Sequence, residues 1–166
     1  MRSRTALRAG SPRLGLFLLL AGAFACGYAP TTGKNLLPEK ARRIFVRPLE
    51  NQTSDAELGV IVATALRREL ARRGADAGAA APAHLEGAVL LSTFGPTAVG
   101  GTYQARIRVQ VRLVVDGKTE TEFISEQGEE LLAGQDPLES EGRRRLALRH
   151  AADAVARDVV ERLEAP

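Results

Sequence analysis

The sequence predicts an α+β domain in which two helices pack on one face of a small four-stranded mixed sheet. Three observations support this prediction: apolar residues at helical spacing after residue 54, strict alternation from Tyr103, and a long amphipathic pattern that begins at Asp136-Pro137. With three further strand patterns they give the order β-α-β-β-β-α. The chain has 166 residues, 45% of them hydrophobic, which suits one domain with its own core.

Arg43 to Leu49 predicts the first strand, because Ile44 and Val46 share an apolar face. A helix is expected next, since Ser54 to Glu57 has the spacing of a capping box and apolar residues then recur at helical intervals. Gly74 is placed to end that helix.

Three strands are predicted to follow. Ala83 to Phe94 suits the first of them, and Gly95-Pro96 breaks it. From Tyr103 to Leu113 apolar and polar residues alternate, which places one face in the core and the other in water. Asp116-Gly117 is a typical hairpin pair, so Lys118 to Leu131 is expected to return as the last strand.

The final helix is expected to open at Asp136-Pro137. Both helices have an apolar stripe, so we expect them on the same face of the sheet, with the other face in water. The expected core positions of the final helix include Leu138, Leu148, Ala152, Val155, Val159 and Leu163.

Residues 1–25 have the features of a secretory signal peptide. Four arginines precede an apolar run from Leu14 to Leu20, and small residues follow up to Ala25. The 12 residues from Leu14 to Ala25 are too few for a membrane-spanning helix, which needs about 20. We therefore expect cleavage; an uncleaved membrane anchor is the alternative.

The only cysteine, Cys26, follows this signal directly. Ala23 to Cys26 resembles the bacterial lipobox, in which the thiol receives a diacylglycerol group and the new amino terminus receives an acyl chain. We expect Cys26 to carry these lipids, residues 26–41 to form a tether and residues 42–166 to form the domain. The alternatives are an ordinary cleavage site with an incidental cysteine, or a thiol for an intermolecular disulfide. The residue after Cys26 is Gly27 and not an acidic residue, which predicts that the lipoprotein is sorted to the periplasmic face of the outer membrane.

The charge of the chain argues against nucleic acid as a partner. The whole sequence has 23 basic and 20 acidic residues, with a net charge of +3. Four arginines belong to residues 1–25, so the remainder has 19 basic residues and a net charge of −1. A protein that binds nucleic acid by neutralising its phosphates is expected to be positively charged after the signal peptide is removed.

No combination of residues predicts an enzyme. His84, at the start of a strand, and His150, among arginines of the final helix, are interpreted as structural or solvated, and Cys26 is expected to be acylated. No CxxC, HExxH or P-loop spacing occurs, so neither a metal nor a nucleotide cofactor is expected. The carboxylates Glu126, Glu129 and Glu130 are interpreted as a solvated strand end.

Several segments, in this order, resemble the LptE family of lipopolysaccharide-assembly lipoproteins. They are Cys26-Gly27-Tyr28, IFVRPLENQT, LRRELARRG, HLEGAVLLS, YQARIRVQVRLVVDG and EGRRRLALRHAADAVARDVVERL. The resemblance covers nearly the whole chain after the signal. It implies two helices on one face of a small sheet, and a role as partner and plug of the outer-membrane β-barrel LptD in lipopolysaccharide delivery.

The resemblance also implies lipopolysaccharide binding through basic residues. The candidate contacts, to lipopolysaccharide or to the barrel, are Arg106, Arg108 and Arg112, with Lys118 beside the hairpin turn. Alternatively, the arginines form an ordinary solvated face that pairs with glutamates of the next strand.

A second class of function stays open: a periplasmic lipoprotein adaptor, LpoB-like or CsgG-like, of a peptidoglycan synthase or a secretion pore. A third possibility is a lipid-binding module with a hollow apolar groove. The dense core of small residues argues weakly against that groove.

Overall fold

A computed structural model describes residues 37–98, 100–132 and 134–165. Residues 1–25, Cys26 and most of the predicted tether lie outside these ranges. The elements are η1 (Glu39–Ala41), β1 (Ile44–Val46), β2 (Glu50–Asn51), α2 (Leu58–Arg72), β3 (Ala83–Pro96), β4 (Thr102–Val115), β5 (Lys118–Leu132) and α3 (Pro137–Glu164). The predicted α+β class is confirmed.

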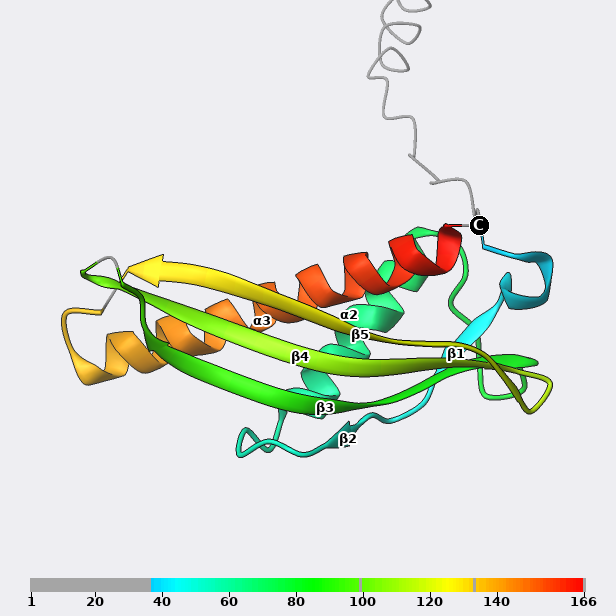
Figure 1. Ribbon diagram of the computed structural model, residues 1–166, viewed down its shortest axis with the longest axis horizontal. Helices are drawn as coiled ribbons and strands as arrows, with labels where there is room; N and C mark the ends of the chain where they lie inside the picture. Colours follow the sequence, from blue (N-terminus) through cyan, green and yellow to red (C-terminus); the bar gives the residue numbers. More distant parts are fainter. Residues whose placement is uncertain (1–36, 99, 133, 166) are drawn as a thin grey trace, which may run out of the picture. The chain divides into compact units, whose positions relative to one another are not determined.

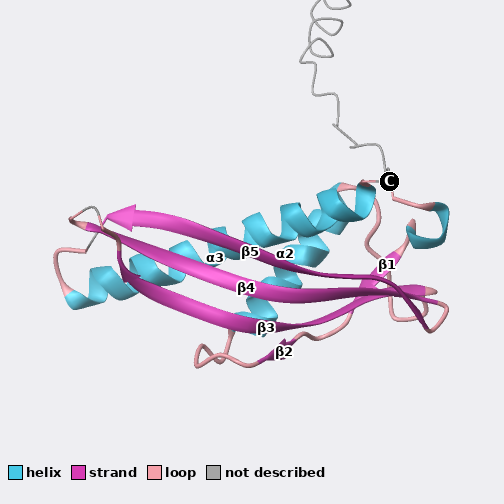
Figure 2. Ribbon diagram, in the orientation of Figure 1, coloured by secondary structure: helices cyan, strands magenta, loops and turns pink. Residues whose placement is uncertain are grey.

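The strands form one mixed sheet, and both helices lie on the same face of it (Figures 1 and 2). The order is β1-β3-β4-β5, with β2 also paired to β3. β1 and β2 run parallel to β3, whereas β3, β4 and β5 are antiparallel neighbours. The sheet therefore has five strands, not the four that the sequence predicts.

The additional strand arises because the predicted strand at Arg43–Leu49 is interrupted. Three residues, Arg47 to Leu49, lie opposite two residues of β3, between the pairs Val46–Leu85 and Glu50–Ala88. Pro48 has no N–H to donate, and Leu49 is buried in the core. One edge strand is thereby divided into β1 and β2.

The helix α2 begins later than predicted, and the expected capping box is wrong. Its N-cap is Glu57, with no side-chain hydrogen bond, and the first helical residue is Leu58. The preceding residues form a compact turn instead, in which the Asn51 amide donates to the carbonyl of Asp55 over 2.7 Å. Because of this loop conformation, α2 begins about one helical turn later in the sequence than predicted.

The predicted break at Gly95-Pro96 is wrong, because β3 continues through Pro96, which pairs with Tyr103 of β4. Three other predicted ends are confirmed. Gly74 has φ +68°, and the N–H of Ala75 donates to the carbonyl of Leu70, which closes the end of α2. Asp116 and Gly117 both have positive φ, as the tight hairpin requires. Asp136 caps α3 by accepting a hydrogen bond from the N–H of Glu139 over 2.8 Å.

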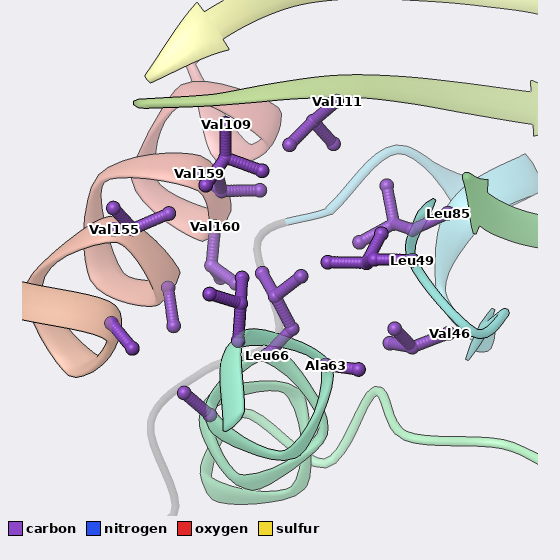
Figure 3. Close-up of a cluster of buried hydrophobic side chains, with 14 of the residues drawn as sticks. Val46, Leu49, Ala63, Leu66, Leu85, Val109, Val111, Val155, Val159 and Val160 are labelled. Carbon is purple, nitrogen blue, oxygen red and sulfur yellow. The ribbon is translucent and has the colours of Figure 1, made fainter. Parts of the chain in front are cut away.

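The core lies between the sheet and the two helices. Figure 3 shows Leu66 of α2, Val160 of α3 and Val109 of β4 converging in it, and all three are fully buried. Leu138 was expected there but is 86% exposed, because it lies in the first turn of α3. Leu37 and Ala41, which precede β1, are buried in the same core.

Candidate functional site

The face of the sheet opposite the helices carries the predicted arginines. Along β4, Ala105, Ile107, Val109 and Val111 are fully buried, whereas Arg106, Arg108 and Arg112 alternate with them on the other face. The predicted alternation is confirmed. We call this surface, formed by the outward side chains of β3, β4 and β5, the sheet face.

On the sheet face each arginine of β4 reaches a glutamate of β5. Arg108 pairs with Glu126 over 2.7 Å and Arg106 approaches the same carboxylate at 3.5 Å. Arg112 pairs with Glu122 over 3.2 Å. These partners lie directly across the two strands in the case of Arg108 and Arg112, so the hairpin register determines the pairing.

The ion pairs make the sheet face polar and close to neutral. Hydrogen bonds from Arg112 and Gln110 hold the pKa of Glu122 below its ordinary value. Glu120 does not join them, since it lies at an irregularity of the register between Thr119 and Thr121. Glu86 of β3, opposite Arg112, and Glu130 of β5, opposite Gln104, lie on the same side of the sheet, so the three arginines leave no positive charge in excess.

The structure does not bring Lys118 to these arginines. Lys118 pairs with Val115, which is buried on the helix side of the sheet. Residues directly opposite one another in a sheet point to the same side. Lys118 therefore belongs to the hairpin end and not to the sheet face.

A polar network that the sequence analysis missed joins three parts of the fold. Asp55, in the turn before α2, accepts hydrogen bonds from Ser92 of β3 over 2.7 Å and from Arg144 of α3 over 2.6 Å. Asn51 accepts hydrogen bonds from the N–H and hydroxyl of Thr53 in the same turn. The motif Asn-x-Thr-x-Asp was the available signal, but its partners are 37 and 89 residues away.

The network favours the charged forms of its members. The Ser92 hydroxyl and the Arg144 guanidinium lower the pKa of Asp55. Hydrogen bonds from Arg144 and Arg145 lower the pKa of Glu141 to about 2. Hydrogen bonds to Glu141 and Asp55 raise the pKa of Arg144. The arrangement fastens α3 to the loop before α2.

Two hollows lie along the groove between α2 and α3. One, of about 290 Å³, is lined by the start of α2 and by Arg144, Arg145 and Arg149. The next, of about 230 Å³, is lined by residues of both helices that include Arg68 and Leu146. Both hollows are open, so they are surface depressions and not an enclosed cavity.

The described residues contain no group of three or more His, Cys, Asp or Glu side chains that could hold a metal ion. His84 contacts Glu86 at 2.9 Å and His150 contacts Glu129 at 3.4 Å, far from one another. Among the same residues, neither helix is long and apolar enough to cross a membrane.

Comparison with protein families identifies the fold. A family model described as "LptE: Lipopolysaccharide-assembly" matches residues 41–163, which is most of the chain. The chain belongs to the LptE family. The match spans every strand and helix from β1 to β5 and nearly all of α3, so LptE membership rests on the whole domain. A search of curated proteins finds no match.

Solved structures share this LptE-type fold at low sequence identity. A protein from Caulobacter crescentus CB15 has a TM-score of 0.55 at 18% identity, covering 70% of this chain and 88% of that one. A Xanthomonas campestris protein also has 0.55, at 12% identity and 74% and 85% coverage. PelC of Paraburkholderia phytofirmans, solved as a dodecamer, has 0.51, at 15% identity and 78% and 95% coverage. These similarities show the fold alone.

Proposed function

We propose that this LptE-family lipoprotein pairs with the outer-membrane β-barrel LptD and plugs it, assisting the transport and assembly of lipopolysaccharide. It acts by binding and carries out no reaction of its own. The family match over residues 41–163 carries this proposal.

The sheet face supports a position inside a barrel. The interior of a wide outer-membrane barrel is polar. A protein that plugs the barrel therefore needs a polar outer surface. Arg106, Arg108 and Arg112 with their glutamates provide such a surface. A guanidinium that exchanges its glutamate for a new partner suits a phosphate of lipopolysaccharide or an acidic group of the barrel.

The anchor in this proposal is a lipid on Cys26, at the periplasmic face of the outer membrane. Two or more acyl chains hold a protein stably on a bilayer, because each buried methylene contributes about 0.8 kcal/mol. Changing Cys26 to Ser is expected to release the protein into the soluble periplasmic fraction. Retention of the variant in the membrane would refute acylation as the anchor.

The partner is tested by purifying the affinity-tagged full chain from detergent-solubilised outer membranes. A large β-barrel protein is expected to co-purify with the tagged chain. Reversing Arg106, Arg108 and Arg112 to Glu should weaken its recovery, and changing the same three to Gln separates loss of charge from repulsion by the neighbouring glutamates. Reversing Lys40 and Arg43, exposed before β1, is the matched control.

Recovery of a penicillin-binding protein in place of a barrel would favour the LpoB-like adaptor instead. Equal barrel recovery by the arginine variants, with helicity intact by circular dichroism, would remove the sheet face from the contact. Both outcomes are read from the same gel and the same mass spectra.

A further inference from the structure

Most of the exposed charged residues of the two helices are arginines. Seven arginines of α2 and α3 are exposed, whereas Glu161 is the only exposed acidic residue in these two helices, and neither helix contains a lysine. The exposed arginines are Arg67, Arg68, Arg72, Arg145, Arg149, Arg157 and Arg162. The sheet face, in contrast, neutralises its arginines with glutamates of β5.

Arg68, Arg145 and Arg149 line the groove between the helices, and Arg72 and Arg157 lie on the same sides of α2 and α3, four residues after Arg68 and eight after Arg149. We call the surface of these five arginines the helix face. The other two turn to the sides. Arg67 donates to the carbonyl of Val46, and Arg162 lies over the ring of Phe123. The helix face follows the groove between α2 and α3, whose two hollows share Ile61 and Arg149.

Two arginines of the helix face have no partner among the described residues. Arg149 and Arg157 have no hydrogen bond or ion pair with another described residue. Arg68 pairs with Asp153 over 3.1 Å, Arg145 with Glu141 over 2.8 Å, and Arg72 with Glu69, but all three arginines remain more than half exposed. Half-buried Asp153, exposed Glu57 and exposed Glu161, which is four residues after Arg157, oppose part of this charge.

The groove also exposes apolar surface beside the charge. Leu146 is 52% exposed, and partly buried Ile61 and buried Ala65 line the same hollow. A bilayer surface can bind both the arginines and the apolar side chains. Its phosphate groups accept paired hydrogen bonds from guanidinium, and apolar side chains insert into the membrane interface. An acidic protein surface would complement the charge of the arginines, but it would offer no apolar contact for Leu146.

We propose that the helix face rests on the anionic phospholipid headgroups of the bilayer when the barrel is not bound. The inference uses the lipid on Cys26 proposed above. Ten residues, 27–36, separate Cys26 from Leu37, where the described chain begins, and they reach at most about 35 Å when extended. A domain on this tether stays close to the bilayer, so weak contacts suffice to orient it.

Orientation is measured on the acylated full chain in vesicles that contain a headgroup-attached fluorescence quencher. A fluorophore is placed by Leu146→Cys on the helix face or by Ile124→Cys on the sheet face, positions that are 52% and 50% exposed. With about 30% phosphatidylglycerol in phosphatidylcholine, the label at 146 should be quenched at least about threefold more than the label at 124. The difference should vanish in pure phosphatidylcholine and in about 0.5 M salt.

Affinity is measured separately on the full chain with Cys26→Ser, by co-sedimentation with the same anionic vesicles. Arg149→Glu with Arg157→Glu should reduce binding at least about tenfold, since each basic residue near an anionic surface strengthens binding severalfold. Lys40→Glu with Arg43→Glu should leave it unchanged. Circular dichroism checks that the variants fold.

Equal quenching at 146 and 124, or no salt-sensitive binding of the Cys26→Ser chain, would overturn the inference. So would a variant with Arg149→Glu and Arg157→Glu that binds vesicles normally but loses its barrel partner, because the helix face would then be a protein contact. If the natural chain fails to stay on neutral vesicles, the lipid on Cys26 is refuted instead, and the Cys26→Ser assay still decides the helix face.

Discussion

Arg144 of α3 donates a hydrogen bond to the carboxylate of Asp55 over 2.6 Å, although the two residues are 89 positions apart in the sequence. The same carboxylate accepts a hydrogen bond from Ser92 of β3. This contact joins the loop before α2, the sheet and the final helix, so it bears directly on how the helices are held over the sheet.

Removing either partner of this contact should destabilise the domain. The side chains of Asp55 and Arg144 are 20% and 28% exposed. Asp55→Ala removes one of the two carboxylates that Arg144 contacts, and Arg144→Ala leaves the partly buried Asp55 without its ion pair, so each should cost about 1–2 kcal/mol. The double variant should cost less than the sum of the two. Urea unfolding measures all three. Arg145→Ala, on a side chain that is 71% exposed, should change stability by less than about 0.5 kcal/mol.

Acid should weaken the fold through the same network. The folded state lowers the pKa of Asp55 from its ordinary 3.8 and that of Glu141 from 4.5 to about 2. A lowered pKa gives stability that is present above the ordinary value and is lost as the pH falls through the folded value. The urea concentration at the midpoint of unfolding should therefore decrease as the pH is lowered from about 4.5 to 2. Asp55→Asn should flatten this dependence; an unchanged slope would exclude Asp55 as a contributor.

Gly87 of β3 should not tolerate a side chain. A Cβ atom there would collide with the carbonyl oxygen of Gln110 on the neighbouring strand, whereas a Cβ at Gly95 of the same strand meets nothing within 4 Å. Gly87→Ala is expected to cost about 2 kcal/mol or more, and Gly95→Ala less than about 0.5 kcal/mol. Thermal unfolding of both variants tests this, and similar melting temperatures would contradict the close approach of β3 to β4.

Two leucines of α3 should differ sharply. Leu148 is 4% exposed and Leu138 is 86% exposed, so Leu148→Ala should cost about 2–4 kcal/mol and Leu138→Ala less than about 0.5 kcal/mol. Chemical denaturation of both variants is the measurement. A large effect at Leu138 would mean that the first turn of α3 packs differently.

Much of the fold could be predicted because its signals are local. Alternation along β4, the Asp116-Gly117 turn and the capped start at Asp136 all depend on residues a few positions apart. The interruption of the first strand could not be predicted in the same way. It depends on Arg47 to Leu49 lying opposite only two residues of β3, which is a property of the assembled sheet.

The candidate site was predictable in composition but not in pairing. The sequence identifies Arg106, Arg108 and Arg112 as one face, yet the hairpin register decides which glutamates neutralise them. The network around Asp55 required contacts across 37 and 89 residues. Likewise, the helix face combines positions of two helices that are distant in sequence, so neither helix alone indicates a shared basic groove.

Photo-crosslinking from the sheet face tests the central claim most directly. A photoreactive residue in place of Thr93, which is exposed and lies opposite Arg106 on β3, leaves all three arginines intact. Irradiation of cells followed by mass spectrometry should join this position to peptides from the interior of one large outer-membrane β-barrel. Crosslinks to a peptidoglycan synthase, or none to any barrel, would contradict the proposed role.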